Sequence, residues 1–165
     1  MEATEAKNPI IVEHRELRQD SGGAGKFRGG LGVSNEVRMR RPATIDAHVE
    51  RTICAPWGLD GGKDALANRI FIRRDDGAVE IYPTGKIKPT EIGKSDGFTV
   101  ETAGGGGFWN PLERPAEKVL ADVRSGYVSL EAARREYGVV IRQEGRRFDL
   151  DVSATAEMRR SREKY

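Results

Sequence analysis

The sequence predicts an α+β protein: an antiparallel β-rich domain with glycine-rich loops, followed by a small C-terminal helical region. Apolar and polar residues alternate in short runs up to about residue 110, and 17 of the 20 glycines precede residue 108. After Pro111 the apolar spacing becomes helical. We therefore expect a β-rich domain over residues 1–110. Residues 111–165 should form short helices that pack on the sheet or on a partner subunit, because such helices are not stable alone.

The expected strands are short and are separated by turns about every 8 to 12 residues, which indicates an antiparallel sheet. The Asp75-Asp76-Gly77 sequence suits a tight hairpin, because glycine readily adopts a positive φ. Residues 10–12 are expected to open a strand. The other expected strands lie in residues 33–39, 44–53, 69–73, 78–82 and 98–102.

Three helices are expected after residue 111. Residues 116–123 place their apolar side chains on one helical face. Ser129 suits the N-cap of a second helix and Gly138 its C-terminal stop. Asp151 is expected to cap a final polar helix that ends near Glu163.

Composition excludes several classes of protein. No apolar run approaches the roughly 20 residues of a membrane span, and the acidic, polar N-terminus encodes no secretory signal, so we expect a cytoplasmic protein. The single cysteine, Cys54, excludes an internal disulfide and any multi-cysteine metal site, and we expect it to be buried and inert.

Charge argues against nucleic-acid binding. The net charge is +2: residues 1–110 carry 16 basic and 16 acidic side chains, and residues 111–165 carry 12 and 10. An RNA-binding alternative would use the single Arg28-Gly29-Gly30 motif and the basic tail, and it predicts binding that depends steeply on salt. The neutral β-rich domain favours no nucleic-acid partner. The basic tail consists of Arg159, Arg160, Arg162 and Lys164.

Glycine clusters occupy residues 20–30, 56–62 and 104–107. Gly25-Lys26 is not a phosphate loop, because the Walker pattern needs a serine or threonine where Phe27 stands. The first cluster suits a turn where backbones approach closely, and its amides could hold an anion. Residues 104–107 fit a flexible linker or a close-packed loop equally well. The candidate substrate or phosphate contacts are Asp20, Ser21, Gly22, Gly23, Arg28 and Arg51.

The sequence contains no catalytic constellation. His14 and His48 are expected at the surface of strands, and Asp46 shares a face with His48 but lacks a third ligand for a metal. We therefore assign no catalytic residue and no metal ligand.

Five motifs in order resemble the hydantoinase B/oxoprolinase family, over roughly residues 5–156. Phe108-Trp109 stands where that family commonly has Tyr-Gly. The motifs are Glu13 with Leu17–Gly32, Pro56–Leu59 with Gly61-Gly62, Gly104–Gly107, Asp122-Val123 with Gly126–Ser129, and Glu131–Ala133 with Tyr137–Val140.

The resemblance implies a subunit of an ATP-dependent enzyme that opens a cyclic amide such as a hydantoin or 5-oxoproline. Phosphorylating the amide oxygen would create a leaving group that water can displace. The expected partners in a hetero-oligomer are a hydantoinase A-type ATP-binding subunit and an N-terminal hydantoinase B-type subunit. ATP with Mg²⁺ and a divalent metal are implied for those partners, with no cofactor bound by this chain alone, which we expect to be inactive alone.

The chain resembles only the C-terminal part of the family's longer members, as a separate subunit or as a fragment. The runner-up is a subunit of an ATP-dependent ketone carboxylase of the acetone or acetophenone type. A third reading is a non-catalytic assembly or binding domain whose helical tail docks a partner.

Overall fold

The structure, a computed structural model, describes residues 2–162. The expected end of the last helix near Glu163, and the basic residue Lys164, lie outside this range. Tertiary contacts divide the chain into two compact units. We name them the β unit, up to Arg18 with Gly32–Ala55 and Ala67–Ala103, and the glycine–helix unit, Gln19–Leu31 with Pro56–Leu66 and the chain from Gly104 onward.

These units differ from a single boundary at residue 110. All three glycine-rich clusters belong to the unit that contains the C-terminal helices. The physical reason is that the glycine segments bond to one another across long stretches of sequence. The Gly23 amide, for example, donates to the Gly105 carbonyl at 2.9 Å.

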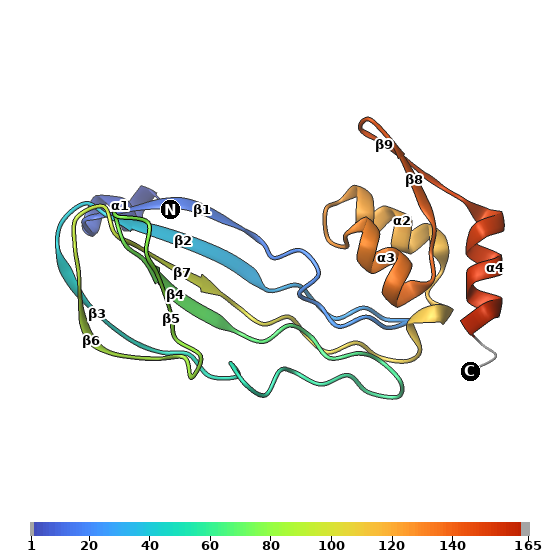
Figure 1. The fold of residues 1–165 in the computed structure, drawn as a ribbon, viewed down its shortest axis with the longest axis horizontal. Coiled ribbons are helices and arrows are strands. Elements are labelled where there is room, and N and C mark those ends of the chain that lie inside the picture. The colour runs from blue at the N-terminus through green and yellow to red at the C-terminus, as the bar shows by residue number, and fades with distance from the viewer. Residues whose placement is uncertain (1, 163–165) are drawn as a thin grey trace. The chain divides into compact units, whose positions relative to one another are not determined.

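The main sheet of the β unit is antiparallel, as predicted. It has five strands in the order β1-β2-β7-β4-β5 (Figure 1). Its edge strands are β1 and β5. A short helix, α1 (Glu2–Lys7), precedes the sheet. The sheet strands are β1 (Ile10–Leu17), β2 (Val33–Met39), β4 (Arg69–Arg73), β5 (Val79–Ile81) and β7 (Gly97–Glu101).

A second, two-stranded antiparallel sheet completes the β unit. It pairs β3 (Ala43–His48) with β6 (Lys86–Ile92). Alternating apolar residues of both sheets form one core, so burial of apolar surface holds the two layers together. The buried side chains of this core are Met39, Ile70, Ile72, Ile87 and Ile92.

Two predictions about this unit are wrong. The strand expected over residues 44–53 ends at His48, because Arg51 turns the chain with a left-handed φ of 53°. Consequently Ile53 lies outside any strand, and Cys54, expected to be buried, is exposed.

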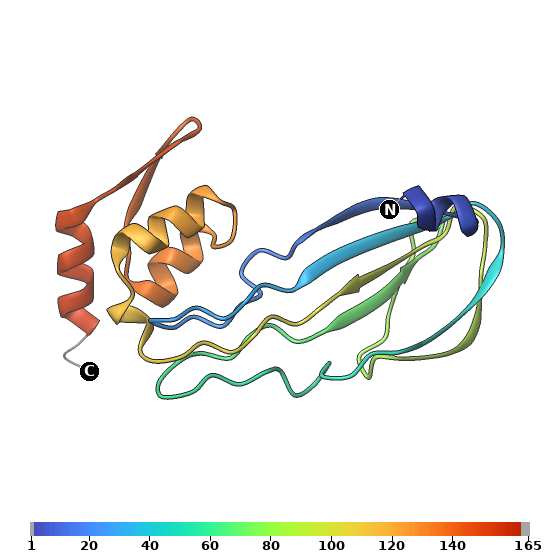
Figure 2. The same cartoon turned by 180° about the vertical axis from the view of Figure 1, so that it is seen from behind.

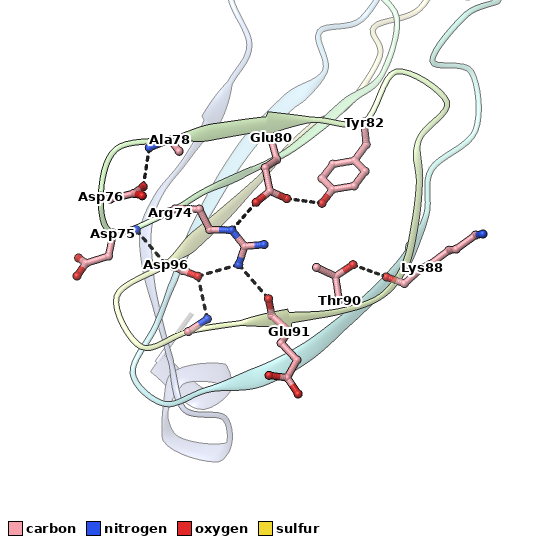
Figure 3. Close-up of polar contacts among 11 residues, drawn as sticks. Arg74, Asp75, Asp76, Ala78, Glu80, Tyr82, Lys88, Thr90, Glu91 and Asp96 are labelled. Carbon is pink, nitrogen blue, oxygen red and sulfur yellow. Dashed lines mark hydrogen bonds and ion pairs between the residues drawn. The ribbon is translucent and has the colours of Figure 1, made fainter.

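An ion-paired network closes the end of the β unit where β4 and β5 meet (Figure 3). Asp96 lies in the turn before β7 and accepts hydrogen bonds from the amides of Gly93 (2.8 Å) and Asp75 (2.9 Å). Arg74 donates to Asp96 at 2.9 Å and to Glu80 at 2.6 Å. Asp96 is only 7% exposed, so this carboxylate joins its own turn to the Arg74-Asp75 segment in a poorly solvated place.

We expect Asp96→Asn to lower the free energy of unfolding by about 1–3 kcal/mol, because an amide nitrogen would face donors that now meet a carboxylate. Asp76→Asn is the matched control: its side chain accepts one bond, from the Ala78 amide, and is exposed. Urea unfolding followed by circular dichroism measures both. Equal losses in the two variants would contradict the role of Asp96.

The Asp96 carboxylate also makes the stability of the protein depend on pH in acid. Burial acts to raise the pKa of Asp96, but bonds from Gly93, Arg74 and Asp75 outweigh it, so the net pKa lies below the ordinary 3.8. A lowered folded-state pKa contributes stability above the unfolded pKa and loses it as pH falls. The difference in stability between wild type and Asp96→Asn should therefore shrink as pH falls below 3.8.

The glycine–helix unit contains the expected helices. Contacts in this unit bring α2 and α3 together beside the hairpin β8–β9 (Figure 2). Its core is formed by apolar residues of these helices with Ala24 from the first glycine cluster. Its elements are the 3-10 turn η1 (Pro111–Glu113), α2 (Ala116–Arg124), α3 (Leu130–Tyr137), β8 (Ile141–Glu144), β9 (Arg147–Leu150) and α4 (Val152–Arg162).

Helix ends are as predicted. The Ser129 hydroxyl accepts from the Ala132 amide at 3.0 Å, and Gly138 ends α3 with a left-handed φ of 61°. The Asp151 carboxylate accepts from the Ala154 amide at 3.0 Å at the start of α4. Capping side chains satisfy amides that have no partner within the helix.

Candidate functional site

Three extended, glycine-rich segments pack side by side in the glycine–helix unit and form a glycine bundle, defined here as residues 20–30, 56–66 and 104–108. Backbone bonds link them: the Lys63 amide donates to Ala24 (2.7 Å), and the Gly107 amide donates to Lys63 (2.9 Å). Residues 104–107 are therefore a close-packed loop and not a flexible linker.

Backbone contact explains why the bundle is made of glycine. A Cβ on Gly29 would lie 1.9 Å from the Gly105 carbonyl oxygen, and one on Gly106 would lie 1.9 Å from the Trp57 oxygen. Separations this short are impossible for a side chain, and the obstructing atoms are backbone. The glycines allow main chains to approach more closely than any other residue permits.

A hollow of about 290 Å³ lies beside the bundle, within the same unit. Its wall brings Asp20 and Gly22 of the first cluster together with Lys63 and Tyr137. The other residues of the wall are Ala24, Asp64, Leu66, Val128, Ala132, Arg135 and Glu136. Glycine-rich main chain, apolar side chains that include residues of α3, and charges of both signs thus meet in one concave place.

Asp20 connects the first glycine segment to α3. Its carboxylate accepts from the Ser129 amide at 2.8 Å, and its own amide donates to Tyr127 at 3.1 Å. Its φ is 59°, a left-handed conformation that aspartate tolerates better than most residues. Asp20 therefore positions the first turn of α3 against the glycine bundle.

The next three predicted contacts, Ser21, Gly22 and Gly23, contribute backbone atoms to the glycine bundle. Ser21 is fully buried, and its carbonyl accepts from the Leu66 amide at 2.9 Å. A Cβ on Gly22 would meet the Gly29 oxygen at 2.4 Å, and the Gly23 amide is used by Gly105.

Arg28 is held by a buried ion cluster. Its guanidinium contacts Asp122 at 3.3 Å and donates to the Gly29 carbonyl at 2.8 Å. Arg114 contacts the same carboxylate at 2.8 Å, and Arg28 also lies over the Tyr127 ring, 5.5 Å from its centre. Two arginines share one carboxylate, with each of the three side chains 11–14% exposed. An anion contact by Arg28 would compete with this cluster.

Arg51 belongs to the β unit, and the other five predicted residues belong to the glycine–helix unit. Its left-handed backbone turns the chain after β3, and its carbonyl accepts from the Asn68 amide at 3.1 Å. The anion contact expected for these six residues stays a prediction.

Sequence reasoning missed Lys63 and Tyr137 as residues of the hollow. Lys63 follows Gly61-Gly62, and its position in the bundle depends on a backbone pairing that has no sequence signal. Tyr137 is 2% exposed, and burial raises the pKa of its phenol to about 12, so it stays protonated at neutral pH.

An aromatic cluster ends the bundle. The Phe108 and Trp109 rings stack with centres 5.1 Å apart, and Phe27 lies 5.9 Å from Trp109. The Lys26 ammonium lies 4.9 Å from the centre of the Trp109 ring. Trp109 has a φ of 62°, a conformation that glycine adopts at least cost, which agrees with Tyr-Gly being common here in the resembled family.

The histidines offer little to a metal. His48 and Asp46 lie 3.5 Å apart on β3, with side chains 74% and 57% exposed, and His14 bonds to Ser34 at 3.3 Å. Within residues 2–162, no group of three or more His, Cys, Asp or Glu side chains is placed to hold a metal ion. Over the same residues, no helix has the length and apolar character needed to cross a membrane.

The structure defines a class of protein that combines a two-sheet β unit with a glycine bundle and a set of C-terminal helices. Its candidate site is built largely from main-chain contacts. The Hydantoinase B/oxoprolinase family model matches residues 1–111. The chain belongs to the hydantoinase B/oxoprolinase family, as its glycine motifs indicated.

Named relatives cover nearly all of this chain. It is 38% identical over 160 residues to the beta subunit of the caprolactamase of Pseudomonas jessenii, with 94% of this chain and 27% of the relative covered. It is 35% identical to the B component of a putative D-/L-hydantoinase of a Pseudomonas species, covering 97% of this chain and 26% of the relative.

Solved structures agree with this fold. A nucleotide-free acetone carboxylase superposes with a TM-score of 0.86 at 25% identity, over 99% of this chain and 26% of that one. The ATP-dependent caprolactamase of P. jessenii gives 0.80 at 30% identity, over 96% and 28%. The chain thus spans about a quarter of the length of these relatives.

Proposed function

We propose that this chain supplies the C-terminal portion of the hydantoinase B-type component of an ATP-dependent, cytoplasmic, multisubunit enzyme that opens a cyclic amide. The observation that carries the proposal is its 38% identity, over 94% of its length, to the beta subunit of a caprolactamase. Its partners would be a hydantoinase A-type ATP-binding subunit and the N-terminal portion of a hydantoinase B-type chain, which together would hold ATP, Mg²⁺ and a divalent metal.

The role we propose for this chain is to shape one wall of the active site. An amide is a poor electrophile, and transfer of a phosphoryl group from ATP to its oxygen makes that oxygen a leaving group. Water would add to the carbon of this phosphorylated amide, and the ring C–N bond would break with protonation of the leaving nitrogen, which leaves an acyl phosphate. A second water would hydrolyse the acyl phosphate to the carboxylate and free phosphate. The glycine bundle supports the proposal because its segments are closely packed and hydrogen-bonded to one another. A site built on such main chain is held in shape before the reaction begins.

Reconstitution tests the proposal. The three polypeptides of one host are combined, and ADP release is measured with ε-caprolactam, a hydantoin and 5-oxoproline, with and without this chain. We expect substrate-dependent ADP release and ring opening only when the chain is present. Full activity without it would favour the non-catalytic assembly reading and contradict our proposal.

Ketone carboxylation is the second candidate, favoured by the TM-score of 0.86 with an acetone carboxylase. The same reconstituted enzyme, given acetone or acetophenone with labelled bicarbonate, separates the two chemistries. Amide opening leaves bicarbonate carbon out of the product, whereas carboxylation incorporates it.

A further inference from the structure

The face of the five-stranded sheet that points away from the core carries exposed apolar side chains at β5. Ile70 and Ile72 point into the core with 1% and 0% exposure, so the alternate residues of β4 point outward. Two cross-strand rows on the outward face run from β2 to β5: Glu36, Thr99, Phe71 and Ile81, and Arg38, Gly97, Arg73 and Val79.

Charge on this face is concentrated near β2 and β7. Arg73 pairs with Glu36 at 3.4 Å, so the rows begin with polar side chains. At β5 both rows end in exposed apolar side chains, Val79 at 52% and Ile81 at 70%. The solvated face of an antiparallel sheet is usually polar, and an exposed apolar patch on such a face is typical of an interaction site.

The backbone of β5 is also available. The Arg74 amide donates to Ala78 at 2.8 Å and the Tyr82 amide donates to Ile70 at 3.2 Å, which fixes the alternation of the β4–β5 ladder. By that alternation, Glu80 exchanges bonds with β4, and the N–H and C=O groups of Val79 and Ile81 point to the open edge. No strand in residues 2–162 pairs with that edge.

A hollow of about 650 Å³ extends this edge, within the β unit. Ile53, 79% exposed, and Phe71 contribute apolar surface to it beside Val79 and Ile81. Arg69 is the one charged residue of its wall, as far as the described residues go. Arg69 lies 3.9 Å from Glu101, and its own side chain is 69% exposed. An occupant must therefore be mainly apolar, with room for a second carboxylate on the exposed side of Arg69.

We propose that β5 and this hollow receive an extended segment of the hydantoinase B-type polypeptide that lies outside this chain, added as a sixth strand. The segment carries apolar side chains at alternate positions and an acidic residue for Arg69. The inference rests on the proposed function. It is favoured because about three-quarters of each matched relative lies outside the region matched here, whose coverage is 26–28%.

A second copy of this chain is a poorer occupant. Antiparallel pairing of two β5 strands with Val79 opposite Ile81 would place the two Glu80 carboxylates directly opposite each other. Like charges in that position destabilise a strand pair.

Two variants test the interface by different routes. Val79→Arg places a charge in the apolar surface, and Ile81→Pro removes an N–H from the open edge without removing a β4–β5 bond. The matched control is Leu17→Arg, which alters an apolar residue of 50% exposure on the opposite edge strand, β1. The probe is the purified remainder of the hydantoinase B-type polypeptide of the same host, titrated by calorimetry.

We expect both β5 variants to weaken the complex at least about tenfold and the control to leave it unchanged. Hydrogen exchange of the folded wild-type chain should show new protection at Val79 and Ile81 in the complex. Unchanged affinity in both variants, with no new protection, would overturn the inference while leaving the proposed function standing. Failure of the wild-type chain to bind would overturn both, and self-association lost in Val79→Arg would assign the edge to a second copy.

Discussion

Gly29→Ala is expected to unfold the glycine–helix unit, with a loss above about 4 kcal/mol, whereas Gly30→Ala should change stability by less than about 1 kcal/mol. The two glycines are adjacent, but a Cβ on Gly29 would lie 1.9 Å from the Gly105 oxygen, and a Cβ on Gly30 would meet nothing within 4 Å. The obstructing atom is backbone, so no side-chain rotation relieves the clash.

Tryptophan fluorescence during urea unfolding measures this difference directly. Trp57 and Trp109, the two tryptophans of the chain, both belong to the glycine–helix unit. Circular dichroism then reports whether the β unit survives. Equal stability of the two variants would show that the bundle tolerates side chains, and the close-packed description would be wrong.

Asp122→Ala is expected to lower the free energy of unfolding by about 3–5 kcal/mol, because it leaves two largely covered guanidinium groups without their shared carboxylate. Arg28 and Arg114 both contact Asp122, and their side chains are 14% and 12% exposed. The two remaining cations would repel each other in a poorly solvated place.

Glu113→Ala is the matched control for that variant. Glu113 pairs with Lys26 at 2.9 Å, but the side chains are 53% and 34% exposed, so loss of this pair should cost about 0–1 kcal/mol. Chemical unfolding of both proteins at one ionic strength gives the comparison. A loss in Asp122→Ala no larger than in the control would return Arg28 to consideration as an anion contact.

These two predictions distinguish two roles for the first glycine cluster, which are anion binding and packing within its own unit. The sequence predicted that Arg28 contacts an anion. In the structure, the Arg28 guanidinium pairs with the Asp122 carboxylate, 94 residues away along the chain. A pair so distant in sequence has no local signal. The packing of its own unit accounts for the position of Arg28, and a contact with a phosphorylated intermediate stays a prediction that would compete with that cluster.

Local patterns were enough for much of the fold. Alternation predicted β2, β4 and β7, and capping residues predicted where α3 begins and ends, at Ser129 and Gly138. These features depend on neighbours along the chain, where periodicity and capping act. Strand β6 (Lys86–Ile92) was missed because it contains Pro89 and three charged residues, which are uncommon in strands. Proline is tolerated there because each strand of a two-stranded sheet has an unpaired edge.

The sequence by itself determined the class of fold, the family and the helix caps. Only the tertiary structure decided that the three glycine clusters form one bundle with the helices, that Arg51 belongs to another unit, and that β5 ends in exposed apolar residues. The physical reason is the distance along the chain over which each interaction acts. Propensity and capping act over a few residues, whereas a glycine's close contact and an arginine's partner are set by segments that meet only on folding.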